Sequence, residues 1–174
     1  KYTNYTNMHM YNNKGTICKY DSDEAILKEF YLIRLVFYTK RKEYMLKLMN
    51  KELDIYKYKI KFIEEFISGE INILQKEDEQ IETSLLERDY PKFGDENNED
   101  TFSYDYLLNM KIKSLTKKKI EELRKLYENK RAAHDELEFK AEKTLWKDDL
   151  NNFLVVYKQK LELYNENLNN QLKQ

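Results

Sequence analysis

The sequence has very few of the residues that break or cross-link a chain. Its 174 residues include three glycines, one proline and one cysteine. Because glycine and proline are so scarce, tight turns must be few and helices can run long, which argues against all-β and glycine-rich folds. The single cysteine, Cys18, excludes an internal disulfide and is typical of a reducing compartment.

Long apolar runs are missing too. None approaches the roughly 20 residues that a membrane-spanning helix needs, and no secretory signal is visible at the start. We therefore expect no role at a membrane. The first residue is Lys1 and not methionine, so we expect a piece of a longer protein.

Charge is abundant and unevenly distributed. Charged residues make up 36% of the sequence and the net charge is only −1. Residues 28–61 hold ten Lys/Arg against four Asp/Glu, residues 64–100 hold three against thirteen, and residues 101–147 hold twelve against eight. The chain is therefore basic, then acidic, then basic again, and its charge share is typical of long exposed helices.

Turn and capping signals mark the first two segments. Residues 1–22 are predicted to contain a β-hairpin, because the Asn12–Gly15 stretch (NNKG) has the chemistry of a tight turn. An outgoing helix over 23–69 should follow, capped by Asp21 or Ser22, with apolar residues every three or four positions. Gly69 is expected to end it. Within it, the aromatics of residues 29–46 should face returning helices while the cations face water.

Residues 70–115 are predicted to form a compact knob. We expect in it, in order, an extended stretch at 70–74, a short helix that Asp78 caps and Pro91 stops, an acidic loop at 94–100 and a second short helix at 104–109. Thr116 should cap a returning helix over 116–143, and Thr144 a C-terminal helix over 144–174 whose apolar stripe runs from Trp146 to Leu168.

These elements predict a mainly α fold. The expected architecture is a long antiparallel helical coiled-coil arm, with a small helical knob at its tip and a short N-terminal β-hairpin. The knob coincides with the acidic part of the sequence and the arm with the basic parts.

The sequence offers no convincing reaction chemistry. Asp21 and Asp23 could form a magnesium-binding pair, but an amphipathic helix follows at once, so helix capping explains them better. Tyr38 lies beside cations, yet it is on the apolar stripe and has no metal cluster nearby. The remaining candidate ligands, His9, Cys18 and His134, are too scattered for a metal site. We predict no catalytic, cofactor-binding or metal site in this segment.

The basic arm could contact DNA. Phosphate contact needs only cations at reachable spacing, and a solvated helix face explains the same pattern equally well. The candidate phosphate contacts are Lys40, Arg41, Lys42, Lys47 and Lys51.

Several blocks in a fixed order resemble the eukaryotic type IIA DNA topoisomerases, in the coiled-coil and C-gate segment of their breakage-reunion core. They are MHMYNNKGTICKY (8–20) with the following FYLIRLVFYTKRK (30–42), FIEEFISGEINI (62–73), YDYLLNM (104–110), SLTKKKIEEL (114–123) and TLWKDDL (144–150). Together they cover roughly residues 5–157, and their order is more specific than any single block.

The resemblance implies a parent enzyme that is a homodimer in the nucleus, or at a viral or cytoplasmic DNA-replication site. It would cut one duplex, pass another through and reseal the first, using ATP and magnesium. The family's nucleophilic tyrosine follows an arginine, and no Arg-Tyr dipeptide occurs here. This segment would then be the inactive lower arm and the exit gate for the transported duplex.

Under this interpretation two copies would meet through apolar residues of the knob under twofold symmetry. The candidate interface residues, some of which must belong to the knob's own core, are Phe66, Ile67, Ile71, Ile73, Leu85, Leu86, Tyr90, Phe93, Leu107 and Leu108. Acidic residues of the loop, Asp95, Glu96, Glu99 and Asp100, would repel phosphates at the exit. Two alternatives stay open: a structural coiled-coil tether without a DNA role, and a stand-alone DNA-binding module that uses the basic helix.

Overall fold

The computed structural model describes residues 7–73, 77–95, 98–111, 113 and 115–171, without the side chains of 95, 98–101 and 168–171. The chain divides into two compact units. Unit 1 comprises residues 1–45 and 138–174, and unit 2 comprises residues 46–137.

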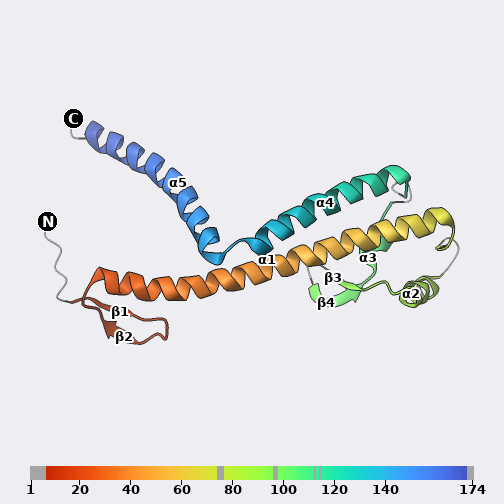
Figure 1. Cartoon of the computed structure of the whole chain (residues 1–174), viewed down its shortest axis with the longest axis horizontal. Coiled ribbons are helices and arrows are strands. Elements are labelled where there is room, and N and C mark those ends of the chain that lie inside the picture. The colour runs from red at the N-terminus through yellow and green to blue at the C-terminus, as the bar shows by residue number, and fades with distance from the viewer. Residues whose placement is uncertain (1–6, 74–76, 96–97, 112, 114, 172–174) are drawn as a thin grey trace. The chain divides into compact units, whose positions relative to one another are not determined.

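The fold is mainly α, with one long helix, several shorter ones and an N-terminal antiparallel hairpin, as predicted (Figure 1). The elements in chain order are β1 (His9–Tyr11), β2 (Ile17–Lys19), α1 (Asp23–Ser68), α2 (Asp78–Glu87), β3 (Phe93–Asp95), β4 (Asn98–Ser103), α3 (Asp105–Leu108), α4 (Lys117–Phe139) and α5 (Glu142–Gln171). Helix α1 contributes its first half to unit 1 and its second half to unit 2. Among the described residues, no helix has the combined length and apolar character needed to cross a membrane.

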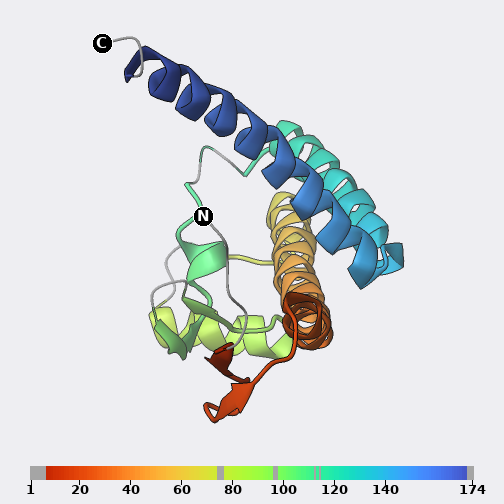
Figure 2. The same ribbon diagram turned by 90° about the vertical axis from the view of Figure 1, so that its left-hand side faces the viewer.

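The predicted N-terminal hairpin is confirmed. Strands β1 and β2 pair antiparallel, and the Asn12 carboxamide oxygen closes the turn by accepting from the backbone N–H groups of Lys14 and Thr16, each at 3.0 Å. Gly15 has φ +74°, which an L side chain rarely adopts. The hairpin lies beside the start of α1 (Figures 1 and 2), where the Tyr20 hydroxyl donates to Glu29 at 2.8 Å.

Local capping signals determine both ends of α1. The Ser22 hydroxyl accepts from the Ala25 N–H, which satisfies one of the free donors of the first turn. At the other end Gly69 has φ +78°, and the Ile71 N–H donates to the Glu65 carbonyl at 3.1 Å. This left-handed glycine cap is the one the sequence predicts.

Among the described residues of unit 1, the contacts of helix α5 with α1 come from its first turns. The Trp146 ring stacks on Tyr31 and Tyr38, with ring centroids 5.3 and 5.7 Å apart. Beyond Asp149 the described apolar side chains of α5, from Leu150 to Tyr164, are all at least 43% exposed.

Beyond this contact α5 diverges from α1 (Figure 1), so most of the apolar stripe predicted from Trp146 to Leu168 has no partner among the described residues of unit 1; the Leu168 side chain is outside them. The predicted start of the last helix is wrong. It begins at Glu142 and not after a Thr144 cap, since the Ala141 carbonyl already accepts from the Thr144 N–H at 2.9 Å.

Unit 2 has its own hydrophobic core. Its buried members come from different elements, among them Phe62 and Ile63 of α1, Leu85 of α2, Leu107 of α3, and Ile120 and Leu123 of α4, with Tyr104 beside them. Ion pairs join Glu64 to Arg124 at 2.7 Å and Glu52 to Lys130. The residue further along α4, Lys130, pairs with the residue that comes earlier in α1, Glu52. Helix α4 therefore runs antiparallel to the second half of α1, as expected.

The knob differs from its prediction in one element. The described residues of the predicted acidic loop at 94–100 belong to two paired strands, β3 and β4: Phe93 opposes Ser103 and Gly94 opposes Phe102, with a register shift after Gly94. Aromatic packing anchors this second hairpin, because the Phe93 ring meets the Tyr106 ring edge-on at 4.9 Å. Residues 96 and 97 are outside the described residues.

One smaller prediction about the knob is wrong. Helix α2 has Glu77, not Asp78, at its N-cap, without a side-chain capping bond. Residues 71–73, in the stretch predicted to be extended, belong to neither a helix nor a strand, and Leu74 is outside the described residues.

Candidate functional site

The structure divides the ten candidate interface residues of the knob by burial. Ile71, Leu85, Tyr90 and Leu107 are at most 3% exposed and belong to the core of unit 2. Side chains buried this deeply cannot also meet a second protein without unfolding the unit. These four residues therefore stabilise the knob and do not form its outer surface.

Three of the ten are exposed and available for contact. Leu86 is 67% exposed, Ile67 is 42% exposed and Leu108 is 37% exposed. The contrast is sharpest in α2, where Leu85 is fully buried and its neighbour Leu86 points outward. Helical periodicity produces this contrast, because adjacent positions lie about 100° apart around the helix.

The last three candidates are intermediate. Phe66 and Ile73 are partly buried and pack against the core of unit 2. Phe93 packs its ring against Tyr106, as described above. They can form the border of a contact surface, with Ile67, Leu86 and Leu108 as its exposed part.

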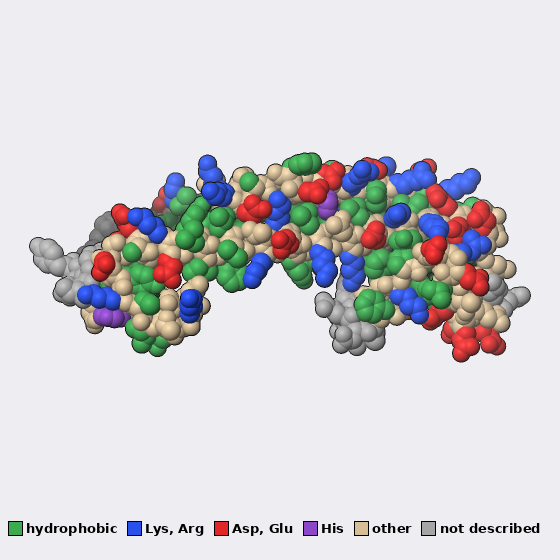
Figure 3. Space-filling model, turned by 60° about the horizontal axis from the view of Figure 1, so that its bottom comes forward, with side chains coloured by type: hydrophobic (Ala, Val, Ile, Leu, Met, Phe, Trp, Pro, Cys, Tyr) green, Lys and Arg blue, Asp and Glu red, His purple; other side chains and the backbone are tan. Residues whose placement is uncertain are grey.

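Acidic side chains surround α2 in unit 2. The exposed acids of this helix are Asp78, Glu79, Glu82 and Glu87. In the space-filling view acidic side chains gather at the lower right (Figure 3). Only Glu82 has a cationic partner among the described residues, Lys92 at 2.7 Å. The acids predicted to repel phosphate, Asp95, Glu96, Glu99 and Asp100, have side chains outside the described residues, so α2 supplies the described acidic surface.

Three of the five candidate phosphate contacts already have partners. Arg41 pairs with Asp149, and the Lys42 ammonium donates to the Lys140 carbonyl at 2.8 Å and lies 3.6 Å from Glu142. Lys51 donates to the Gly94 carbonyl at 3.1 Å. Each would have to give up or share these bonds to bind phosphate.

The other two cations are less constrained. Lys40 is exposed and lies over the Phe37 ring, 5.6 Å from its centroid. Lys47 is exposed and has no partner among the described residues. Of the five, Lys40 and Lys47 are therefore the better placed to meet DNA.

Tyr38 has a structural role. It is 3% exposed, and its hydroxyl donates to the Asp149 carboxylate at 2.7 Å. Burial and this hydrogen bond to an anion both raise the pKa of the Tyr38 phenol, which is the opposite of what a nucleophilic tyrosine needs. The same bond, followed by Arg41, lowers the pKa of the Asp149 carboxyl.

Sequence reasoning missed Asp149 as the partner of Tyr38 and Arg41. Its signal was its position one helical turn after Trp146 on the same side of α5, but periodicity alone cannot pair it with a residue more than a hundred positions away. Of the metal-site candidates, the Cys18 thiol accepts from the Asn12 amide at 3.3 Å, and the His134 ring lies 3.3 Å from the Asp135 carboxylate.

Comparisons with known proteins point to one family. The sequence model of the family that comprises the A subunits of DNA gyrase and topoisomerase IV matches residues 1–151. The DNA topoisomerase 2 of Acanthamoeba polyphaga mimivirus is 38% identical, over 97% of this chain and 14% of that protein. The DNA topoisomerase 2-alpha of Gallus gallus is 33% identical, over 87% of this chain and 11% of that protein.

A solved structure agrees with these relatives. The DNA-binding, cleavage and re-ligation domain of Plasmodium falciparum topoisomerase II superposes with a TM-score of 0.78 at 26% identity, over 95% of this chain and 25% of that one. The chain thus spans only a small part of the length of its relatives. The match over residues 1–151 and the 38% identity to the mimivirus protein show that the chain belongs to the type II DNA topoisomerases, as a segment of their breakage-reunion core.

Proposed function

We propose that this segment forms a coiled-coil arm and the exit gate of a homodimeric type II DNA topoisomerase. The gate is the contact between two knobs through which a transported duplex leaves after strand passage. Unit 2 supplies the knob and the adjoining part of the arm. Family membership supports the enzyme class, and the antiparallel packing of α4 on α1 supports the arm.

The observation that carries this proposal is the surplus apolar surface of unit 2. Its core is complete without Ile67, Leu86 and Leu108, yet these side chains are 37–67% exposed. A twofold contact would bury them on both copies, since the same patch meets itself. An ordinary interface buries on the order of 1,600 Å² in total, so the contact must also recruit border residues such as Phe66.

The activity belongs to the whole enzyme. We expect the parent protein to cut, pass and reseal duplex DNA with ATP and magnesium, in the nucleus or at a viral or cytoplasmic replication site. The segment itself is expected to contribute no catalytic residue, cofactor or metal site. Its role is mechanical, because it holds two subunits together while DNA is cut and opens once per cycle.

Charge gives the knob a second role. The exposed acids of α2 would repel DNA phosphates at the exit and so favour release, with the acids of 94–100 adding to this field. In a chimera whose matching segment is replaced by this chain, Asp78→Asn with Glu79→Gln should slow release of the duplex and change the salt dependence of strand passage. If neither turnover nor its salt dependence changes, exit repulsion is wrong.

Sedimentation equilibrium of the 174-residue chain tests the gate. We expect concentration-dependent dimers, and Leu86→Lys should weaken them at least about tenfold, because it places a charge in an apolar contact. The matched control is Leu126→Lys, at a position 46% exposed on α4 of the same unit. Equal effects of the two substitutions, or a chain that stays monomeric at every concentration, would reject a gate built on Leu86.

The same samples separate the two alternatives. A structural tether should pair along its helices, so Leu126→Lys would weaken dimers more than Leu86→Lys does. A stand-alone DNA-binding module should hold duplex tightly with steep salt dependence. A gate segment should bind duplex weakly, since three of its five candidate phosphate contacts already have partners.

A further inference from the structure

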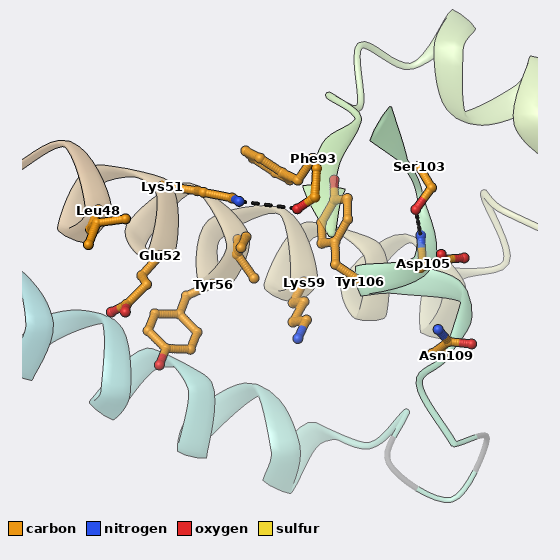
Figure 4. Close-up of a pocket in the computed structure, with 12 residues that line it drawn as sticks. Leu48, Lys51, Glu52, Tyr56, Lys59, Phe93, Ser103, Asp105, Tyr106 and Asn109 are labelled. Carbon is orange, nitrogen blue, oxygen red and sulfur yellow. Dashed lines mark hydrogen bonds between the residues drawn. The ribbon is translucent and has the colours of Figure 1, made fainter. Parts of the chain in front are cut away.

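Unit 2 contains a cavity that the gate does not explain. Its volume is about 550 Å³, within the range of small-molecule sites. It lies between the second half of α1, the β3–β4 hairpin and α3 (Figure 4). Its apolar lining consists of Leu48, Ile55, Tyr56, Phe93 and Tyr106.

One wall of the cavity is aromatic and held in place. The Phe93 and Tyr106 rings pack at an interplanar angle of 79°. The Tyr106 hydroxyl donates to the Pro91 carbonyl at 3.0 Å, which fixes the ring and satisfies its polar end. What Tyr106 offers the cavity is therefore apolar ring surface, which favours a flat ligand over a polar one.

Most charges around the cavity are already neutralised or bonded. Lys51 donates to the Gly94 carbonyl, as the dashed line in Figure 4 shows, and Glu52 pairs with Lys130. Asp105 lies at the opposite end, with its carboxylate pointing away from Lys51 and Lys59 (Figure 4). Its backbone N–H donates to the Ser103 hydroxyl at 3.3 Å.

Of the two lysines that line the cavity, Lys59 has no such bond. It is partly buried, and none of the described residues accepts a hydrogen bond from its ammonium group or pairs with it. Burial lowers the pKa of Lys59, and the nearby Lys119 of α4 lowers it further. Lys119 itself has Glu122 at 3.1 Å. A half-buried cation that faces another cation, with no counterion among the described residues, is a position that an anion would stabilise.

We propose that this cavity binds a small planar aromatic anion, with its ring against Phe93 and Tyr106 and its acidic group beside Lys59. The chemistry is that of a two-ring aromatic carrying a phosphate, sulfonate or carboxylate. Such a ligand would touch α1, β3 and α3 at once and so tie the hairpin to the long helix within unit 2. This inference is independent of the proposed gate.

Two simple probes test the proposal on the 174-residue chain. 1-Naphthyl phosphate carries the ring and the charge, whereas 1-naphthol carries the ring alone. By isothermal titration calorimetry, we expect the phosphate to bind about tenfold more tightly than the neutral probe, because a charge-assisted hydrogen bond contributes about that factor. Lys59→Gln should remove this difference while leaving the binding of 1-naphthol unchanged.

The control is Lys57→Gln, on the exposed side of the same helix. It removes the same charge without altering the cavity, so both probes should bind as before. Phe93→Leu, checked for folding by circular dichroism, should weaken both probes alike. The proposal would be overturned if neither probe saturates the protein, or if Lys59→Gln keeps the preference for the phosphate. It would also be overturned if Lys57→Gln loses this preference as fully as Lys59→Gln does.

Discussion

The sharpest consequence of the structure concerns two adjacent leucines of α2. Leu85 is 0% exposed and is the buried residue of this helix, whereas Leu86 is 67% exposed. Leu85→Ala should therefore leave a cavity in the hydrophobic core of unit 2 and lower its free energy of unfolding. Core Leu→Ala substitutions cost about 2–5 kcal/mol. We expect a loss of about 3 kcal/mol, within this range, because Leu85 is the buried residue by which α2 joins the core.

Leu86→Ala is the matched comparison. Its side chain touches little within the chain, so its loss should change the free energy of unfolding by less than about 0.5 kcal/mol. It should instead weaken self-association. Urea titrations followed by circular dichroism, at a protein concentration below that of dimer formation, measure the first effect. Equal unfolding midpoints for the two variants would refute the division of the knob into core and surface.

Three further predictions concern the contacts and caps of α1. Trp146→Ala removes two stacked ring contacts, with Tyr31 and Tyr38, and should reduce the unfolding free energy by about 2 kcal/mol in a thermal melt followed by circular dichroism. A melt unchanged within error would mean that α5 is not held there. The folded-state pKa of the Asp149 carboxyl is lowered, so its stabilisation is complete above its ordinary pKa of about 3.9 and is lost as the pH falls through the folded value. In thermal melts at different pH, Asp149→Asn should make the melting temperature fall less steeply at acidic pH, and an unchanged acid dependence would contradict this. In Gly69→Ala the new Cβ would meet open space, but the backbone φ of +78° is one that alanine rarely adopts. We therefore expect the unfolding free energy to fall by about 1 kcal/mol, and by less in Gly69→Asn. An unfolding free energy unchanged by Gly69→Ala would contradict a strained cap.

What could be predicted from the sequence was mostly local. The Ser22 and Thr116 caps, the Gly69 terminator and the NNKG turn depend on residues within a few positions of one another, and the structure confirms all four. The second hairpin was missed because its strands carry acidic residues of low strand propensity. Packing of Phe93 on Tyr106, which lies outside those strands, outweighs that propensity.

Helical periodicity does not establish burial. A helical stripe shows which side chains share a face, but it does not say whether their partner lies in the same chain. This is why the stripe of α5 could be predicted but not its burial, and Leu150 and Tyr164 on it are exposed. It is also why Leu85 and Leu86 could not be separated into core and surface before the structure placed them.

Disulfide cross-linking tests the central claim most directly. The chain would replace the matching segment of the mimivirus DNA topoisomerase 2, with Cys18→Ser in this chain and each of Ile67→Cys, Leu86→Cys and Leu108→Cys introduced in turn. The control is Leu126→Cys on α4. We predict that at least one of the three knob cysteines joins two subunits on oxidation, that decatenation then stops, and that a reducing agent restores it. Cross-links from Leu126→Cys alone, or full decatenation with the knobs covalently joined, would contradict the exit gate.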